Sequence, residues 1–134
     1  MNITLDEAVV IVNAAREKAK EIGIPMSFAV VDPHGDLVAF QRMYGSTLRS
    51  IFLSQGKAMA SVHFSRPSGE LSTMADSPIS RSLSLALGGR FIPHQGALPI
   101  LSGQEMRGAV GVSGGPSQRD EEVAQAGMDA LFQN

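Results

Sequence analysis

The chain has 134 residues, no cysteine and a formal net charge of −2. This length fits one domain, the lack of cysteine excludes disulfides and thiolate chemistry, and the scattered lysines and arginines argue against a nucleic-acid partner. No window approaches the ~20 apolar residues that a membrane span needs, and the N-terminal residues lack a signal-peptide pattern. The sequence therefore predicts one cytoplasmic domain over residues 1–134, with no membrane segment.

A first amphipathic helix is predicted over residues 5–22. Thr4 and Glu7 have the spacing of a capping box, in which each side chain bonds the backbone amide of the other residue. Apolar residues then recur at three- and four-residue steps, and charged residues fill the opposite face. Gly23 and Pro25 end the helix, because glycine favours the left-handed cap and proline cannot continue the helix.

A β-hairpin and a second helix follow. Residues 26–32 and 37–43 are short runs rich in β-branched and aromatic side chains, and the Pro-His-Gly-Asp segment between them has turn composition. Residues 48–64 return to helical spacing. Arg66 and Pro67 end this second helix, because the residue before proline disfavours helical geometry.

The last third of the chain predicts another hairpin, over residues 97–101 and 106–113, and a terminal helix that begins near Ser117. Residues 68–89 between these parts show only short helical patterns and no strand. Two hairpins without helical crossovers indicate an antiparallel sheet with helices packed on it. The predicted fold class is therefore α+β.

The last predicted strand carries Gly108 and Gly111 and ends in the run Gly111–Gly115. Glycine inside a strand indicates a close approach of another backbone. Ser113 and Gly114 place a hydroxyl and free amides where a strand ends and a helix begins, which suits a bound anion. A tight turn without a ligand explains the same residues equally simply.

The three histidines lie about 30 residues apart, and no pair has the spacing of a zinc site. For His34, His63 and His94, a surface or packed role competes with a functional one. His94 is the strongest functional candidate, because Pro93 and Gly96 shape its loop. It is predicted either as an axial haem ligand or as a general acid or base.

Three cations lie beside apolar residues near helix and loop ends. Lys57, Arg66 and Arg90 suit a carboxylate or a haem propionate, with ordinary solvated charges as the alternative reading. Together with His63, Ser113 and Gly114 they form the predicted set of ligand-binding residues.

Several stretches, taken together in order, resemble the GlcG/HbpS-like family, which includes the C-terminal domain of PduO proteins. The stretches are Ala29-Val30-Val31-Asp32 with Gly35, Leu37-Val38-Ala39-Phe40, Arg42-Met43, Gly45, Lys57-Ala58, Phe64-Ser65-Arg66-Pro67, Gly88-Gly89, Pro93 with Gly96 and Pro99, the run from Gly108 to Gly115, and Asp120-Glu121. No single stretch is specific, but their order spans nearly the whole chain.

The resemblance implies a profilin-like α+β fold, homo-oligomers, and haem binding in some members. Two functions stay open: binding of haem or a related tetrapyrrole, and a cofactor-independent lyase, isomerase or hydrolase for a small carboxylated or aromatic catabolic intermediate. In the enzyme, His94 acts as acid or base and Arg66 or Lys57 holds the carboxylate. Both functions use the same residues, so the sequence does not separate them.

Overall fold

Helix α1 (Leu5–Ile22) begins at the predicted capping box: the Thr4 hydroxyl accepts a bond from the Glu7 amide at 3.1 Å, and the Glu7 carboxylate accepts one from the Thr4 amide at 3.0 Å. Gly23 ends the helix in the left-handed conformation. The computed structural model describes residues 1–132. Within that range the predicted element order is confirmed, and boundaries move by one or two residues.

Four strands form one antiparallel sheet. Strands β1 (Ser27–Val31) and β2 (Leu37–Arg42) make the first hairpin, and β3 (Ala97–Ser102) and β4 (Glu105–Ser113) make the second. Strands β1 and β4 pair with each other, so the order is β2-β1-β4-β3 and the two hairpins share a central seam. The predicted α+β class with an antiparallel sheet flanked by helices is confirmed.

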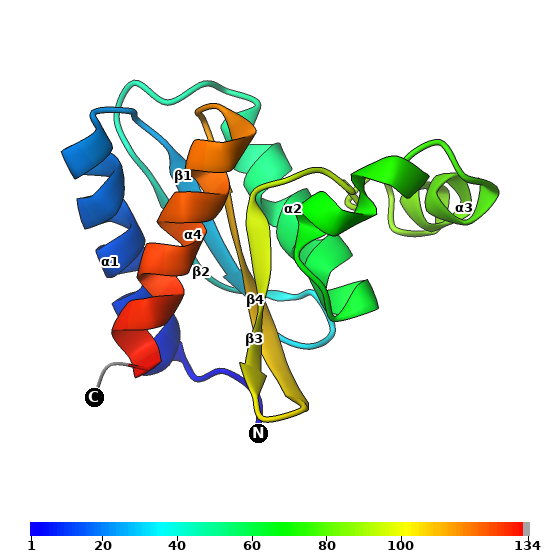
Figure 1. Ribbon diagram of the computed structural model, residues 1–134, viewed down its shortest axis with the longest axis horizontal. Coiled ribbons are helices and arrows are strands. Elements are labelled where there is room, and N and C mark those ends of the chain that lie inside the picture. The colour runs from blue at the N-terminus through cyan, green and yellow to red at the C-terminus, as the bar shows by residue number, and fades with distance from the viewer. Residues whose placement is uncertain (133–134) are drawn as a thin grey trace.

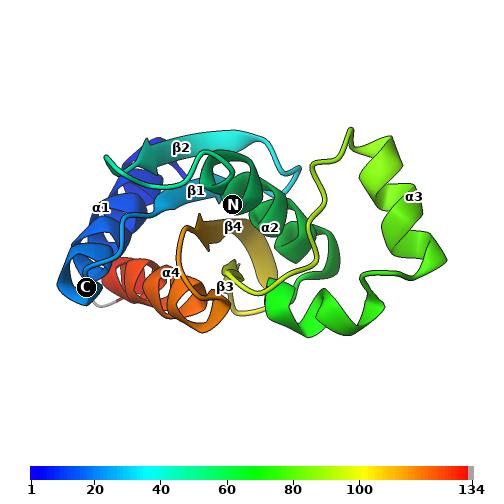
Figure 2. The same ribbon diagram turned by 90° about the horizontal axis from the view of Figure 1, so that it is seen from above.

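Helices cover both faces of this sheet (Figures 1 and 2). Helix α1 and the terminal helix α4 (Ser117–Phe132) pack against each other on one face, and helix α2 (Ser50–Phe64) lies across the other. The main apolar core fills the space between α1, α4 and the sheet. Every residue of β1 is buried, because a central strand with helices on both faces has no solvent side.

The segment that showed only short helical patterns forms two short helices. A 3₁₀ helix, η1, runs over Ser68–Met74, and α3 runs over Pro78–Ala86 and is capped by the Ser77 hydroxyl. Helix α3 projects from the end of the molecule opposite α1 (Figures 1 and 2). Phe91 anchors the chain after α3 in a small apolar cluster with Ala60 and Leu71. None of the helices in the described residues is long and apolar enough to cross a membrane.

The close approach predicted at Gly111 is where α2 meets the sheet. Gly111 pairs with Ala29 on one side and Ala97 on the other, so a row of three small residues crosses the sheet. A methyl group at Gly111 would lie 2.1 Å from the Ser54 carbonyl oxygen and 3.0 Å from Ala58. The missing side chain therefore sets how closely α2 lies on the sheet, and α2 forms one wall of both pockets described below.

We expect Gly111→Ala to lower the free energy of unfolding by about 3 kcal/mol, because the added methyl overpacks against backbone atoms that cannot move independently. Urea denaturation measures the change. Gly115→Ala is the matched control: its methyl would meet the flexible end of Met26 at 3.0 Å, so a loss of less than about 1 kcal/mol is expected. Equal losses in the two variants would contradict this explanation.

Candidate functional site

Two pockets lie on neighbouring faces of α2 and share the loop that precedes β3. One is a polar pocket of about 170 Å³. The other is a larger apolar pocket of about 330 Å³. Ile92 lines the apolar pocket and His94 lines the polar one. The loop therefore turns one side toward each pocket.

The polar pocket contains a buried ion pair between α2 and α4. The Lys57 ammonium lies 3.1 Å from Asp120 Oδ2 and donates a second bond to the Val112 carbonyl at 3.2 Å. Both side chains are almost fully buried, at 3% and 2% exposure. Such a pair is costly to desolvate and is a weak source of stability, so its position in a pocket wall indicates a role beyond holding the fold.

Asp120 also accepts a bond from the Gly115 amide at 2.9 Å. Burial raises the pKa of the Asp120 carboxyl above its ordinary value, and Lys57, the Gly115 amide and the charge on His94 oppose this rise. The carboxyl therefore depends on its neighbours to stay ionised.

Gly96 makes the burial of Lys57 possible. Its φ of +145° is a backbone conformation that residues with a side chain rarely adopt. A methyl group there would lie 2.8 Å from the Lys57 ammonium and 2.6 Å from the Val112 carbonyl oxygen. The backbone of the loop can therefore pass directly over the lysine.

Residues from two parts of the chain complete the polar pocket. Thr47, Arg49 and Leu53 come from α2 and the segment before it. The others come from the end of β4, the β4–α4 connection and the first residue of α4: Ser113, Gly114, Gly115 and Ser117. Ser113 is 4% exposed, and Arg49 is exposed at the start of α2. The pocket thus combines a buried floor with a solvent-exposed cation.

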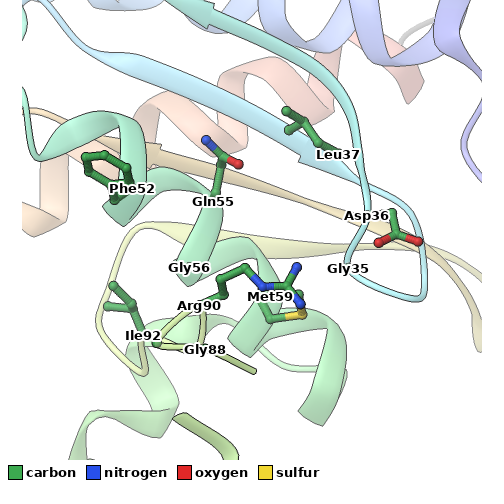
Figure 3. A pocket seen from close by; sticks show the side chains of 11 residues that line it. Gly35, Asp36, Leu37, Phe52, Gln55, Gly56, Met59, Gly88, Arg90 and Ile92 are labelled. Carbon is green, nitrogen blue, oxygen red and sulfur yellow. The ribbon is translucent and has the colours of Figure 1, made fainter. Parts of the chain in front are cut away.

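The apolar pocket lies between α2, the β1–β2 turn and the segment after α3 (Figure 3). Phe52 and Met59 of α2, Leu37 at the start of β2 and Ile92 provide apolar side chains. Gly88 and Gly89 contribute bare backbone, and an added methyl at either would meet nothing within 4 Å. One wall of this pocket is therefore open.

Close packing at two glycines, Gly56 and Gly35, sets the positions of the walls of the apolar pocket. The Ile92 amide donates to the Gly56 carbonyl at 3.1 Å, and a methyl at Gly56 would lie 2.4 Å from the Ile92 side chain. At the turn, a methyl on Gly35 would lie 2.2 Å from the Met59 sulfur. Both glycines let other parts of the chain pack directly against α2.

Arg90 is the cation of the apolar pocket. Its Nε donates to the Leu87 carbonyl at 2.9 Å, and the residue is exposed. Figure 3 shows Arg90 on the segment after α3 and Met59 on α2, and both side chains line the pocket. A guanidinium at the mouth of an apolar pocket suits a ligand with an apolar body and an acidic edge.

The structure brings together four of the predicted site residues and separates the other three. Lys57, His94, Ser113 and Gly114 all line the polar pocket, although His94 remains exposed at its rim. Arg90 lines the apolar pocket instead.

Arg66 and His63 line neither pocket. Arg66 is exposed and pairs with Glu70 at 3.1 Å. The exposed His63 ring packs edge-on against Phe91, with the ring centroids 6.3 Å apart.

Sequence reasoning missed Arg49 and Asp120 as parts of a site. Asp120 has the spacing of a helix cap with Ser117, but its carboxylate accepts bonds from Gly115 and Lys57. The i, i+4, i+8 spacing of Arg49, Leu53 and Lys57 places them on one helix face, a signal that was available. Among residues 1–132, no group of three or more His, Cys, Asp or Glu side chains is placed to hold a metal ion.

A family profile described as haem degrading protein HbpS-like matches residues 3–129. The chain belongs to the HbpS-like family. The resemblance read from the sequence is thereby confirmed. An uncharacterised 15.0 kDa protein of Citrobacter freundii, from the dhaT–dhaS intergenic region, is 32% identical to this HbpS-like chain over 130 residues. The match covers 96% of this chain and 92% of the relative.

Two solved structures share the HbpS-like fold. The crystal structure of Klebsiella pneumoniae protein ORFY superposes with a TM-score of 0.88 at 32% identity, covering 98% of this chain and 92% of that one. A crystal structure of a PduOC–heme complex superposes with a TM-score of 0.87 at 25% identity, covering 97% and 95%. One protein of this fold therefore binds heme.

Proposed function

We propose that the protein binds haem or a related tetrapyrrole in the apolar pocket. The observation that carries this proposal is the pocket itself: apolar side chains on α2, an open wall at Gly88 and Gly89, and one guanidinium, Arg90. One carboxylate, Asp36, also lines the pocket. The heme complex of a protein with the same fold supports it.

The residues of the apolar pocket fit the parts of a haem molecule. Phe52, Met59 and Ile92 suit the flat apolar ring, and the bare backbone at Gly88 and Gly89 leaves room for it. Arg90 is placed to meet a propionate, because its planar fork matches a carboxylate.

A side chain of the protein would hold the haem iron, and methionine sulfur and histidine nitrogen are both common ligands. Met59 lines the pocket, and no histidine does. We therefore propose Met59 as the protein's own iron ligand in the apolar pocket. His94 remains the ligand predicted from the sequence, and it lines the smaller polar pocket. Bound haem would supply an iron centre for ligand binding or redox chemistry.

We expect the protein to bind haemin saturably, and Arg90→Gln to weaken that binding about tenfold, because it removes a charge-assisted hydrogen bond. Absorbance titration with haemin measures the affinity. Arg66→Gln is the matched control, since this equally exposed arginine lines neither pocket. Haemin that fails to saturate the wild type, or an equal loss in both variants, would contradict the proposal.

The polar pocket favours a second candidate function, a cofactor-independent enzyme. His94, Lys57, Asp120 and Ser113 line one small cavity, and this combination offers an acid or base, a cation and a hydroxyl. Here His94, at the rim, is the proposed acid or base. A substrate of the carboxylated class would bring its reacting atoms next to it.

We also propose that copies of the chain associate. Phe52 of α2 lines the apolar pocket and is exposed, and Leu48 and Tyr44 in the segment before α2 are exposed as well. Large exposed apolar side chains of this kind are typical of surfaces that a partner covers.

A further inference from the structure

The polar pocket carries more positive than negative charge. Arg49 and Lys57 face it with cations, and Asp120 is the carboxylate among its lining residues. Lys57 and Asp120 neutralise each other through their 3.1 Å contact. One guanidinium therefore remains uncompensated at the mouth of the pocket, which favours an anion of one negative charge.

The Ser113 hydroxyl is available to a ligand in the same pocket. Ser113 lines the pocket and is 4% exposed, and its hydroxyl donates to no residue from 1 to 132. The hydroxyl oxygen is not one of the fully buried atoms without a partner, so it keeps contact with solvent. A ligand oxygen in the pocket would take the place of that solvent.

The size of the pocket limits the ligand. Its volume of about 170 Å³ lies below the roughly 300–1,000 Å³ of pockets for drug-sized ligands. The cavity therefore encloses only a few non-hydrogen atoms of a ligand, and the rest of a larger ligand would lie outside it.

We propose that the polar pocket binds a small monocarboxylate, held by the Arg49 guanidinium and the Ser113 hydroxyl above the Lys57–Asp120 pair. The flat fork of arginine matches a carboxylate in two parallel bonds. A doubly charged phosphate suits the pocket less well, because Lys57 already donates to Asp120 and Val112. Carboxylate binding in the polar pocket does not depend on haem binding in the apolar pocket, and it can be tested without a catalysed reaction.

His94 stands at the rim of this site. His94, Arg49 and Ser113 line the same pocket, so the rest of a small ligand held by its carboxylate would lie near His94. The site therefore deepens the proposed enzyme function by naming the residues that would hold the carboxylate, while binding alone is enough to test the site.

The test uses the full-length protein and pyruvate as the probe. Titration followed by backbone amide chemical shifts should show saturable changes at Ser113, Gly114 and Gly115 with a millimolar or tighter dissociation constant. Pyruvamide has the same shape without the charge and should bind at least tenfold more weakly. Equal binding of the amide, or no saturable change with pyruvate up to 50 mM, would overturn the proposal, and so would tighter binding of inorganic phosphate.

Two arginine variants identify the group that holds the anion. Arg49→Gln should weaken pyruvate binding at least tenfold. Because Arg49 is exposed, the variant should keep the fold, which circular dichroism checks. Arg119→Gln, in an exposed arginine that pairs with Glu122 on α4, should change the affinity less than twofold. A similar affinity in wild type and Arg49→Gln would overturn the assignment. Haemin titration of Arg49→Gln should match the wild type.

Discussion

Lys57→Met is expected to lower the free energy of unfolding by about 3–5 kcal/mol. The substitution keeps most of the side-chain volume but leaves the Asp120 carboxylate, at 2% exposure, without its cation. An unpaired buried charge lowers the free energy of unfolding by far more than an intact buried pair raises it. Urea denaturation at neutral pH measures the loss.

The pH dependence of the same variant has a defined sign. Burial already raises the pKa of Asp120 in the wild type, and Lys57 opposes that rise, so Lys57→Met raises the pKa further. The folded state then binds a proton more tightly than the unfolded state does, and stability falls as pH rises. The penalty should therefore be largest at neutral pH and shrink as pH falls toward the ordinary value of 3.8.

A double variant separates the lost charge from lost packing. Lys57→Met with Asp120→Leu removes both charges, and it should recover most of the stability, because a hydrophobic replacement of a buried pair is often close to neutral. A double variant as unstable as the single one would show that the pair is needed for packing. A wild-type-like single variant would show that Asp120 does not depend on Lys57.

The sequence predicted the fold more fully than it predicted the site. The capping box at Thr4, the two hairpins and the helical stripe of α2 are local patterns, and each has one dominant structural solution. The close backbone approach at Gly111 could also be predicted, because a glycine inside a strand usually marks such an approach. These signals do not depend on distant parts of the chain.

The site depends on contacts between distant residues, and for that reason the sequence grouped it incompletely. Lys57 and Asp120 are 63 positions apart and meet because the middle of α2 lies beside the first turn of α4 in the folded chain. Arg90 and His94 are close in sequence, but the loop between them turns one to each pocket. The residues predicted from the sequence as one site therefore included members of both the polar and the apolar pocket.

Met59 and His94 lie in different pockets, so the residue that binds the haem iron identifies the pocket in which haem binds. Met59→Leu should weaken haemin binding at least tenfold and change the haem absorption band, because leucine keeps the apolar wall but removes the sulfur that we propose as ligand. The swap conserves volume, so it should cost less than about 1.5 kcal/mol of stability. Thermal denaturation of the haem-free protein checks this.

His94→Ala is the matched variant on the other side of the loop. Because His94 lines the polar pocket and Met59 lines the apolar one, His94→Ala should leave the haem band and the haemin affinity as in the wild type. The opposite pattern, a band lost in His94→Ala and kept in Met59→Leu, would place the iron at the imidazole that the sequence alone predicts. A ring bound there would have to extend from a cavity of about 170 Å³ into solvent or against another copy of the chain.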